Sequence, residues 1–279
     1  MAGSSVDPEY RIALTIIVGV NLFPLVGFVL FDWEPILVGL LYWLDVVSLV
    51  LVYSVCALFA QRWSHTELEE KSLLPGTVGL DYWSDEPRNL SRSLPPVYTR
   101  NLAVIIPTAL FLLFVLFAVG AQAFFGDIEL GRRVAGDAFA FLGAFGVFAT
   151  LEGVVTGAVI IGAHAITIHR AYFRTGKYRD QSAYMVLEST IRFVLLYVTC
   201  LFAFLFYLVL VLAVGEFVVT SIVSETVAQQ GAVVVLAASF LAVKLALERM
   251  RLRAEWTEKA GLTSWFRPSP LPESDDANG

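Results

Sequence analysis

The chain has 279 residues, of which 57% are hydrophobic and 16% are charged, whereas soluble domains average roughly 45–50% and about 25%. A water-soluble chain of this length cannot hide so much apolar surface, so the composition excludes an ordinary soluble domain and predicts the lipid bilayer as a partner. The 25 acidic residues outnumber the 19 basic ones, and the lack of a basic stripe with interleaved aromatic residues argues against a nucleic-acid partner.

Long apolar runs predict an all-α bundle of six membrane-spanning helices. A span needs roughly 20 mainly apolar residues, and five runs meet this length: residues 12–31, 36–60, 102–125, 191–214 and 231–248. A further run, residues 138–168, would be about 46 Å long as one helix, longer than a hydrocarbon core of about 30 Å. Because it has no polar turn, it is either one span kinked near Gly143 and Gly146 or a span plus a surface helix.

The distribution of basic residues predicts how the spans are oriented. With six spans and the N-terminus inside, 17 of the 19 Lys and Arg residues lie on the inner side, leaving only Arg132 and Arg133 outside. The positive-inside rule therefore predicts a cytoplasmic-membrane protein with both termini in the cytoplasm. The predicted segments are a cytoplasmic N-terminus (1–11), a transmembrane hairpin (12–60), an irregular cytoplasmic loop (61–101), a four-span region (102–248), and a cytoplasmic interfacial helix with a disordered acidic tail (249–279).

Two adjacent segments of the N-terminal hairpin carry a motif. The first span contains Asn21-Leu22-Phe23-Pro24-Leu25-Val26-Gly27 followed by Asp32-Trp33, and the second contains Leu41-Tyr42-Trp43-Leu44-Asp45. Together they resemble the N-terminal hairpin of an uncharacterised multi-pass membrane family, a domain of unknown function common in halophilic archaea.

The resemblance implies a six-helix membrane fold in a salt-adapted prokaryote, and it implies no reaction. Lys244 with its flanking aliphatic residues is similar to the last helix of that family. The chain departs from the family pattern where Asp45 replaces the usual Glu and Val46 replaces the expected Asn. The acidic excess, with only 4 lysines among the 19 basic residues, fits a saline cytoplasm.

Five polar residues inside the predicted spans form a candidate site: Asn21, Tyr42, Asp45, Glu152 and His164. Asp45 is expected in the second span and Glu152 near the middle of the fourth, where an acidic group costs about 2.5–3.5 kcal/mol. In a structural interpretation, Asp45 bonds Tyr42 or Asn21 and locks the hairpin. In a functional interpretation, Asp45 and Glu152 line a polar path for a proton, a cation or a small solute.

The fourth predicted helix has small residues at every fourth position, which predict close helix contact: Ala149, Gly153 and Gly157. His164 follows on nearly the same face and is either a packing histidine or a proton relay or ligand. Lys244 is expected to snorkel to the cytoplasmic surface and to pair with Glu248, and Glu188 is expected to pair with Arg192.

The sequence holds no pattern typical of a metal, cofactor or catalytic site. His164 and His169 point about 140° apart on a helix, and neither a His-Glu-x-x-His segment nor a paired-cysteine motif occurs. We therefore predict no cofactor, no metal and no catalytic residue.

The predicted function is binding or permeation of a proton, a cation or a small solute at the polar site. The alternative is a structural or assembly component whose buried acids only lock helix packing. An intramembrane enzyme that uses Asp45 and Glu152 as acid and base is less favoured. Protein partners are not predicted, and a homo-oligomer is compatible with the sequence.

Overall fold

The computed structural model describes residues 8–64, 74–78, 83–92, 94–125, 146, 149–219, 225–256 and 262–268. Its long helices are α1 (Pro8–Leu30), α2 (Pro35–Leu58), α3 (Leu102–Phe125), α6 (Leu151–Ile168), α7 (Ala183–Val219) and α8 (Glu225–Trp256). Short helical turns are η2 (Thr99–Asn101), the π-helical η4 (His169–Phe173), η5 (Lys177–Arg179) and η6 (Leu262–Phe266). Among the described residues, strand pairing is limited to two isolated bridges.

The predicted all-α membrane bundle is confirmed. Among the described residues, five helices are long and apolar enough to cross a membrane: Pro8–Leu30, Ile36–Leu58, Thr99–Gly120, Leu151–Phe173 and Ala183–Phe204. The sixth predicted span, residues 231–248, lies inside α8, and its crossing of the membrane stays a prediction.

The fourth apolar run begins its described helix later than the sequence suggested. α6 starts at Leu151 because Thr150 caps it, its hydroxyl accepting a hydrogen bond from the Gly153 backbone N–H at 3.2 Å. The η4 turn then extends the candidate span to Phe173. The predicted kink near Gly143 lies outside the described residues, so both interpretations of residues 138–168 stay open.

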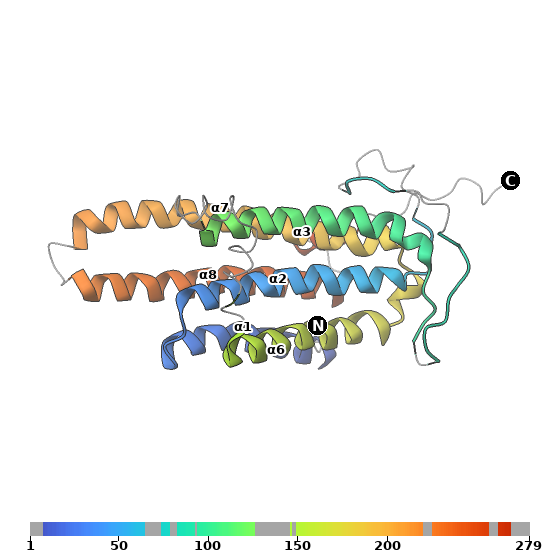
Figure 1. The fold of residues 1–279 in the computed structure, drawn as a ribbon, viewed down its shortest axis with the longest axis horizontal. Helices are drawn as coiled ribbons and strands as arrows, with labels where there is room; N and C mark the ends of the chain where they lie inside the picture. Colours follow the sequence, from blue (N-terminus) through green and yellow to red (C-terminus); the bar gives the residue numbers. More distant parts are fainter. Residues whose placement is uncertain are drawn as a thin grey trace, which may run out of the picture.

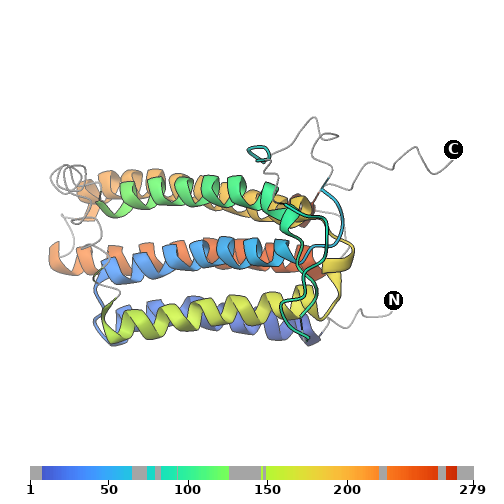
Figure 2. The same ribbon diagram turned by 45° about the vertical axis from the view of Figure 1, so that its right-hand side comes forward.

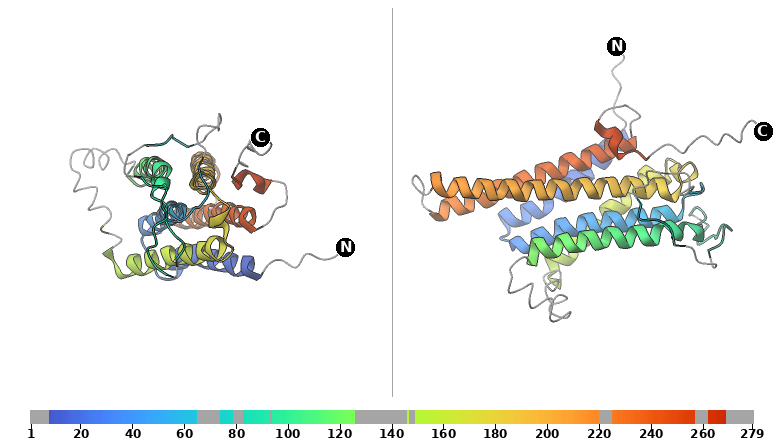
Figure 3. Two further views of the ribbon diagram at one scale, coloured as in Figure 1. Left: turned by 90° about the vertical axis from the view of Figure 1, so that its right-hand side faces the viewer. Right: turned by 90° about the horizontal axis from the view of Figure 1, so that it is seen from above.

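The long helices form three layers of two: α3 with α7, α2 with α8, and α1 with α6 (Figure 1). The same layers are visible after a 45° turn (Figure 2) and along the bundle (Figure 3). α2 packs against α1, α3, α6 and α7. In the most apolar stretch of α2, 61% of the residues are buried, compared with 28% in the corresponding stretches of α1 and α3. Polar groups on α2 are therefore shielded from lipid on several sides.

The α1–α2 connection is a tight turn built by residues of the hairpin motif. Asp32 adopts the left-handed region with φ 51°, and the Trp33 backbone N–H donates to the Gly27 carbonyl at 3.3 Å. The Trp33 indole lies so close to Gly27 that any Cβ there would clash with it. Pro35 then opens α2, where its missing N–H leaves no helical bond unmade. The turn thereby sets the register in which α1 and α2 face each other.

Small residues let α2 approach α3 and α6 closely. A Cβ added to Gly157 would lie 3.1 Å from Leu44 Cδ2, and one added to Gly120 would lie 2.6 Å from Trp43 Nε1. Trp43 also donates this N–H to a backbone carbonyl of α3 at 2.9 Å. The predicted close contact along α6 is thus confirmed at Gly157, whereas Ala149 is exposed.

One end of the bundle, which we call the basic end, gathers the starts of α1, α3 and α7 and the ends of α2, α6 and α8. There Glu9 pairs with Arg170 at 2.9 Å and with Arg174 at 3.2 Å, which ties α1 to the end of α6. The predicted pair between Glu188 and Arg192 also forms at this end, so that prediction is confirmed.

Candidate functional site

Four helices each contribute a buried polar side chain to one cluster near Asp45. We call the following residues the intramembrane cluster: Asn21 on α1, Tyr42 and Asp45 on α2, His164 on α6 and Lys244 on α8. Asp45 is 2% exposed, His164 3% and Lys244 1%. Within the span Ile36–Leu58, Asp45 lies about 14 Å from the start and about 20 Å from the end. The cluster therefore lies near the middle of the apolar segment.

The Asp45 carboxylate binds a basic group on each of its oxygens. Its Oδ1 lies 2.8 Å from His164 Nε2, and its Oδ2 accepts a hydrogen bond from Lys244 Nζ. A lone carboxylate at this depth is unfavourable by about 2.5–3.5 kcal/mol on insertion scales, and the ammonium beside it offsets that penalty. With Lys244 charged and His164 neutral, the cluster has no net charge.

Asn21 and Tyr42 surround the ammonium rather than the carboxylate. The Asn21 side-chain oxygen accepts a second hydrogen bond from Lys244, and the Tyr42 hydroxyl donates to the Asn21 backbone carbonyl at 2.9 Å. The Tyr42 ring lies 5.8 Å from Lys244 Nζ, within cation–π range. The predicted direct bond from Asp45 to Tyr42 or Asn21 is therefore wrong, because Lys244 occupies the place between them.

The two ring nitrogens of His164 differ in their contacts: Nε2 interacts with Asp45, and Nδ1 remains available. Nδ1 is buried and has no hydrogen-bond partner among the described residues. Because Nε2 faces a carboxylate, we assign the proton of the neutral ring to Nε2, which leaves a lone pair on Nδ1. A second proton at Nδ1 would produce an imidazolium beside Asp45. The geometry thus offers one position for an exchangeable proton.

Glu152 does not join the cluster, and its predicted position near the middle of the fourth helix is wrong for the described helix α6. It is exposed in the first turn of α6, about 18 Å along the helix axis from His164. The cause is the start of α6 at Leu151, which leaves Glu152 where a carboxylate interacts favourably with the helix dipole. Among the residues that the structure describes, no group of three or more His, Cys, Asp or Glu could hold a metal ion.

Lys244 was not predicted from the sequence to belong to the candidate site. The predicted snorkelling to the surface and the predicted pair with Glu248 are both wrong, because the side chain instead turns inward to Asp45 and is fully buried. Snorkelling lowers the energy of a lysine that faces lipid, whereas a lysine that faces the bundle can find a carboxylate. Sequence spacing did contain a signal, because Lys244 begins a series of ionisable residues on one face of α8.

We call this series the α8 stripe, and its members are Lys244, Glu248, Arg251 and Glu255. Their spacing of four, three and four residues places them along one face of the helix. Arg251 is 1% exposed and donates to Glu248 at 2.8 and 3.0 Å, to Glu255 at 2.9 Å and to the Tyr53 hydroxyl at 2.6 Å. Tyr53 in turn donates to Glu255. Buried charges therefore continue from the intramembrane cluster toward the basic end, and they join α8 to α2.

Comparison with known proteins assigns residues 6–260 to a family of unknown function, DUF6498. No curated protein and no solved structure gives a significant match. The expectation of a domain of unknown function is confirmed by this match, which covers nearly the whole chain. The chain therefore belongs to the DUF6498 family.

Proposed function

We propose that this membrane protein binds and transfers protons at the intramembrane cluster, with Asp45 and His164 as the exchanging pair. The observation that carries the proposal is a buried carboxylate, near the middle of a span, shared between an ammonium and an imidazole. Ionisable groups in such places are costly and are usually retained for function. Among the candidate permeants, a proton fits best, because both Asp45 oxygens already have basic partners and leave no oxygen for a metal cation.

The proposed transfer uses the two nitrogens of one ring. A proton that arrives at His164 Nδ1 allows Nε2 to give its own proton to Asp45 Oδ1, across the 2.8 Å contact. Asp45 then becomes neutral and Lys244 keeps its charge, so the cluster carries one extra positive charge. Release of the Asp45 proton to water returns the cluster to neutrality and leaves the ring proton on Nδ1. Release of that proton and reprotonation of Nε2 by water then restore the starting tautomer. Asn21 and Tyr42 hold the ammonium throughout.

We further propose that the basic end faces the cytoplasm of a salt-adapted prokaryote, in its cytoplasmic membrane. The positive-inside rule supports this orientation, because the described loops and helix ends there carry many Arg and Lys side chains. The acidic excess of the chain supports the saline setting.

A structural role is the competing proposal, and one observation favours it. The cluster joins α1, α2, α6 and α8, and each charge has an opposite partner, as in a packing lock. The intramembrane-enzyme hypothesis loses support, because Glu152 is exposed in the first turn of α6, about 18 Å along that helix from the His164 that contacts Asp45.

Proton flux into reconstituted vesicles that contain a pH-sensitive dye distinguishes the two roles. His164→Gln keeps a donor toward Asp45 but removes the second nitrogen, so flux is expected to fall at least about tenfold while the amount of folded protein is unchanged. Glu152→Gln is the matched control, since it removes an exposed acid from the same helix, and it should keep wild-type flux. If the wild type carries no flux under a pH gradient and a membrane potential, the proton proposal fails and the packing lock stands.

A further inference from the structure

A cavity of about 630 Å³ opens at the basic end, separate from the intramembrane cluster. Its walls come from α2, the end of α6, the η4 and η5 turns, the start of α7, the end of α8 and η6. Ile168 and Met185 place it near the ends of their candidate spans, which is the depth of lipid head groups. The volume falls in the range of small-molecule sites, about 300–1,000 Å³.

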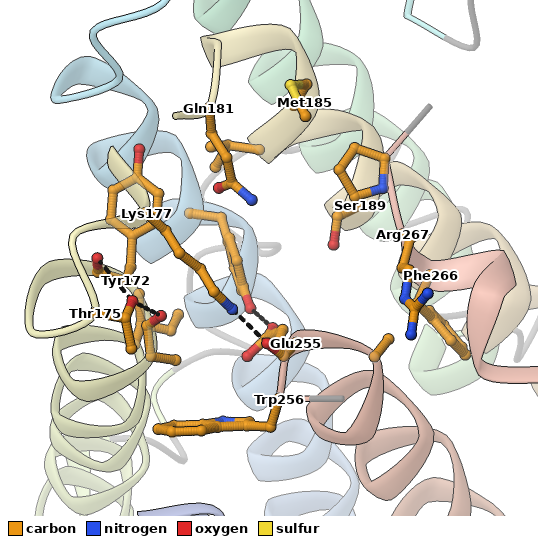
Figure 4. Close-up of a pocket in the computed structure, with 16 residues that line it drawn as sticks. Tyr172, Thr175, Lys177, Gln181, Met185, Ser189, Glu255, Trp256, Phe266 and Arg267 are labelled. Carbon is orange, nitrogen blue, oxygen red and sulfur yellow. Dashed lines mark hydrogen bonds between the residues drawn. The ribbon is translucent and has the colours of Figure 1, made fainter. Parts of the chain in front are cut away.

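Two basic side chains and several hydrogen-bond donors line the cavity. Lys177 and Arg267 approach it from opposite sides (Figure 4). The one acidic residue among the described lining residues, Glu255, already has its Oε1 bound by Arg251 and Tyr53. Glu255 therefore offers its backbone carbonyl, and not a carboxylate oxygen, to the Lys177 ammonium.

Lys177 is a partly buried ammonium that has no anionic partner within the described part of the chain. Its Nζ donates to the backbone carbonyl of Glu255, and no carboxylate lies within ion-pair distance among the described residues. Burial lowers the pKa of Lys177, against the opposing influence of the Glu255 charge. A bound anion would supply the missing negative charge.

Three lining residues also hold buried polar atoms that have no hydrogen-bond partner among the described residues. Trp256 Nε1 and the Tyr172 hydroxyl can donate, and Glu255 Oε2 can only accept while it is ionised. Buried polar atoms are usually satisfied, so this group points to a ligand with both acceptors and donors. A phosphate ester with free hydroxyl groups has both kinds of atom.

We propose that the cavity binds a polyol phosphate ester, with the phosphate between Lys177 and Arg267 and a hydroxyl donating to Glu255. Apolar lining from Ile168, Met185, Val186 and Phe266 leaves room for the carbon skeleton. The chemistry is common to a phosphoglycerol lipid head group of the inner leaflet and to a free glycerol phosphate. This binding site is independent of the proposed proton transfer.

Isothermal titration of the purified full-length protein in uncharged detergent tests the proposal. The probes are short-chain phosphatidylglycerol, short-chain phosphatidylcholine, glycerol 1-phosphate and methyl phosphate. We expect phosphatidylglycerol to bind at least about tenfold more tightly than phosphatidylcholine, because Lys177 and Arg267 would repel the positively charged choline group. Binding of glycerol 1-phosphate as well identifies a free ester as a sufficient ligand, whereas its failure beside bound phosphatidylglycerol identifies a lipid.

Matched variants assign the binding to the cavity. Lys177→Met and Arg267→Gln are each expected to weaken binding about tenfold. Arg179→Gln removes an exposed cation from the same turn as Lys177, and it should change binding less than about twofold. Thermal unfolding of each variant confirms that it is folded, and two variants on different elements guard against the loss of one.

Three results would overturn the proposal. The first is that neither phosphatidylglycerol nor glycerol 1-phosphate binds. The second is that phosphatidylcholine binds as tightly as phosphatidylglycerol. The third is that Arg179→Gln weakens binding as much as Lys177→Met does. Methyl phosphate should bind more weakly than glycerol 1-phosphate by about threefold or more, and equal binding would refute the contact between a hydroxyl and Glu255.

Discussion

Replacing Lys244 by methionine removes the ammonium that faces Asp45 while keeping an unbranched side chain of similar length. The carboxylate is then left with His164 alone, and the Asn21 side-chain oxygen loses its donor. Removing one partner of a buried ion pair costs about 3–5 kcal/mol in proteins, and insertion scales give about 2.5–3.5 kcal/mol for one acid in lipid. We therefore expect Lys244→Met to lower the free energy of unfolding by about 3 kcal/mol or more.

A double-mutant cycle separates the ion pair from general packing. Asp45→Asn alone should be similarly destabilising, because it leaves Lys244 as the unpaired charge. The double variant removes both charges, so its cost should be only about 1–3 kcal/mol, mainly from hydrogen bonds that are lost. The interaction energy between the two positions should then be at least about 2 kcal/mol.

Unfolding by sodium dodecyl sulfate in mixed micelles, followed by far-ultraviolet circular dichroism, measures these free energies. Arg249→Met is the matched control, because Arg249 is an exposed cation on the same helix, and it should change stability by less than about 0.5 kcal/mol. The reasoning is refuted if the single-variant costs add within about 0.5 kcal/mol, since independent sites behave in that way.

Three further predictions test packing, orientation and pH dependence. Gly120→Ala should lower the free energy of unfolding by about 1–3 kcal/mol, because the added Cβ would lie 2.6 Å from Trp43 Nε1. Gly162→Ala is the control and should be neutral or stabilising, because a Cβ there would have nothing within 4 Å; equal effects of the two variants on SDS unfolding would contradict this. Leu90, which is 69% exposed, should react as Leu90→Cys with an impermeant maleimide only from the cytoplasmic side, in a background without the native cysteines; labelling of intact cells would reverse the orientation. Burial lowers the pKa of Lys177, so between that value and the ordinary 10.5 the unfolded chain binds more protons, and the penalty from Lys177 fades as the pH rises. The melting temperature of the wild type should therefore rise relative to that of Lys177→Met as the pH rises toward 10.5, and a constant difference would disprove the shift.

The spans and the hairpin could be predicted because their signals are local. Apolar length fixes the helices, and the Asp32-Trp33 turn brings Asn21 and Tyr42 opposite each other within 21 residues of chain. His164 and Lys244 lie 119 and 199 residues from Asp45. Whether residues so distant in sequence contact a buried acid depends on the order of the helices around α2, and no local pattern encodes that order.

Two errors at the site had signals that could have prevented them. Thr150 is a strong N-cap type, and its position before Leu151 indicates a helix start that places Glu152 at an exposed first turn. The spacing of Lys244, Glu248 and Arg251 indicates a single polar face, which a helix inside a bundle would turn toward its neighbours.

The α8 stripe has a consequence for how the chain is assembled in the membrane. Four ionisable side chains on one helix make solitary insertion from the translocon unfavourable, at about 2.5–3.5 kcal/mol for each one that reaches the hydrocarbon centre. Asp45 on α2 is made first, and its ammonium partner is synthesised 199 residues later. A nascent chain that stops before α8 therefore leaves the Asp45 carboxylate with His164 but without its ammonium, and only synthesis of α8 supplies that cation.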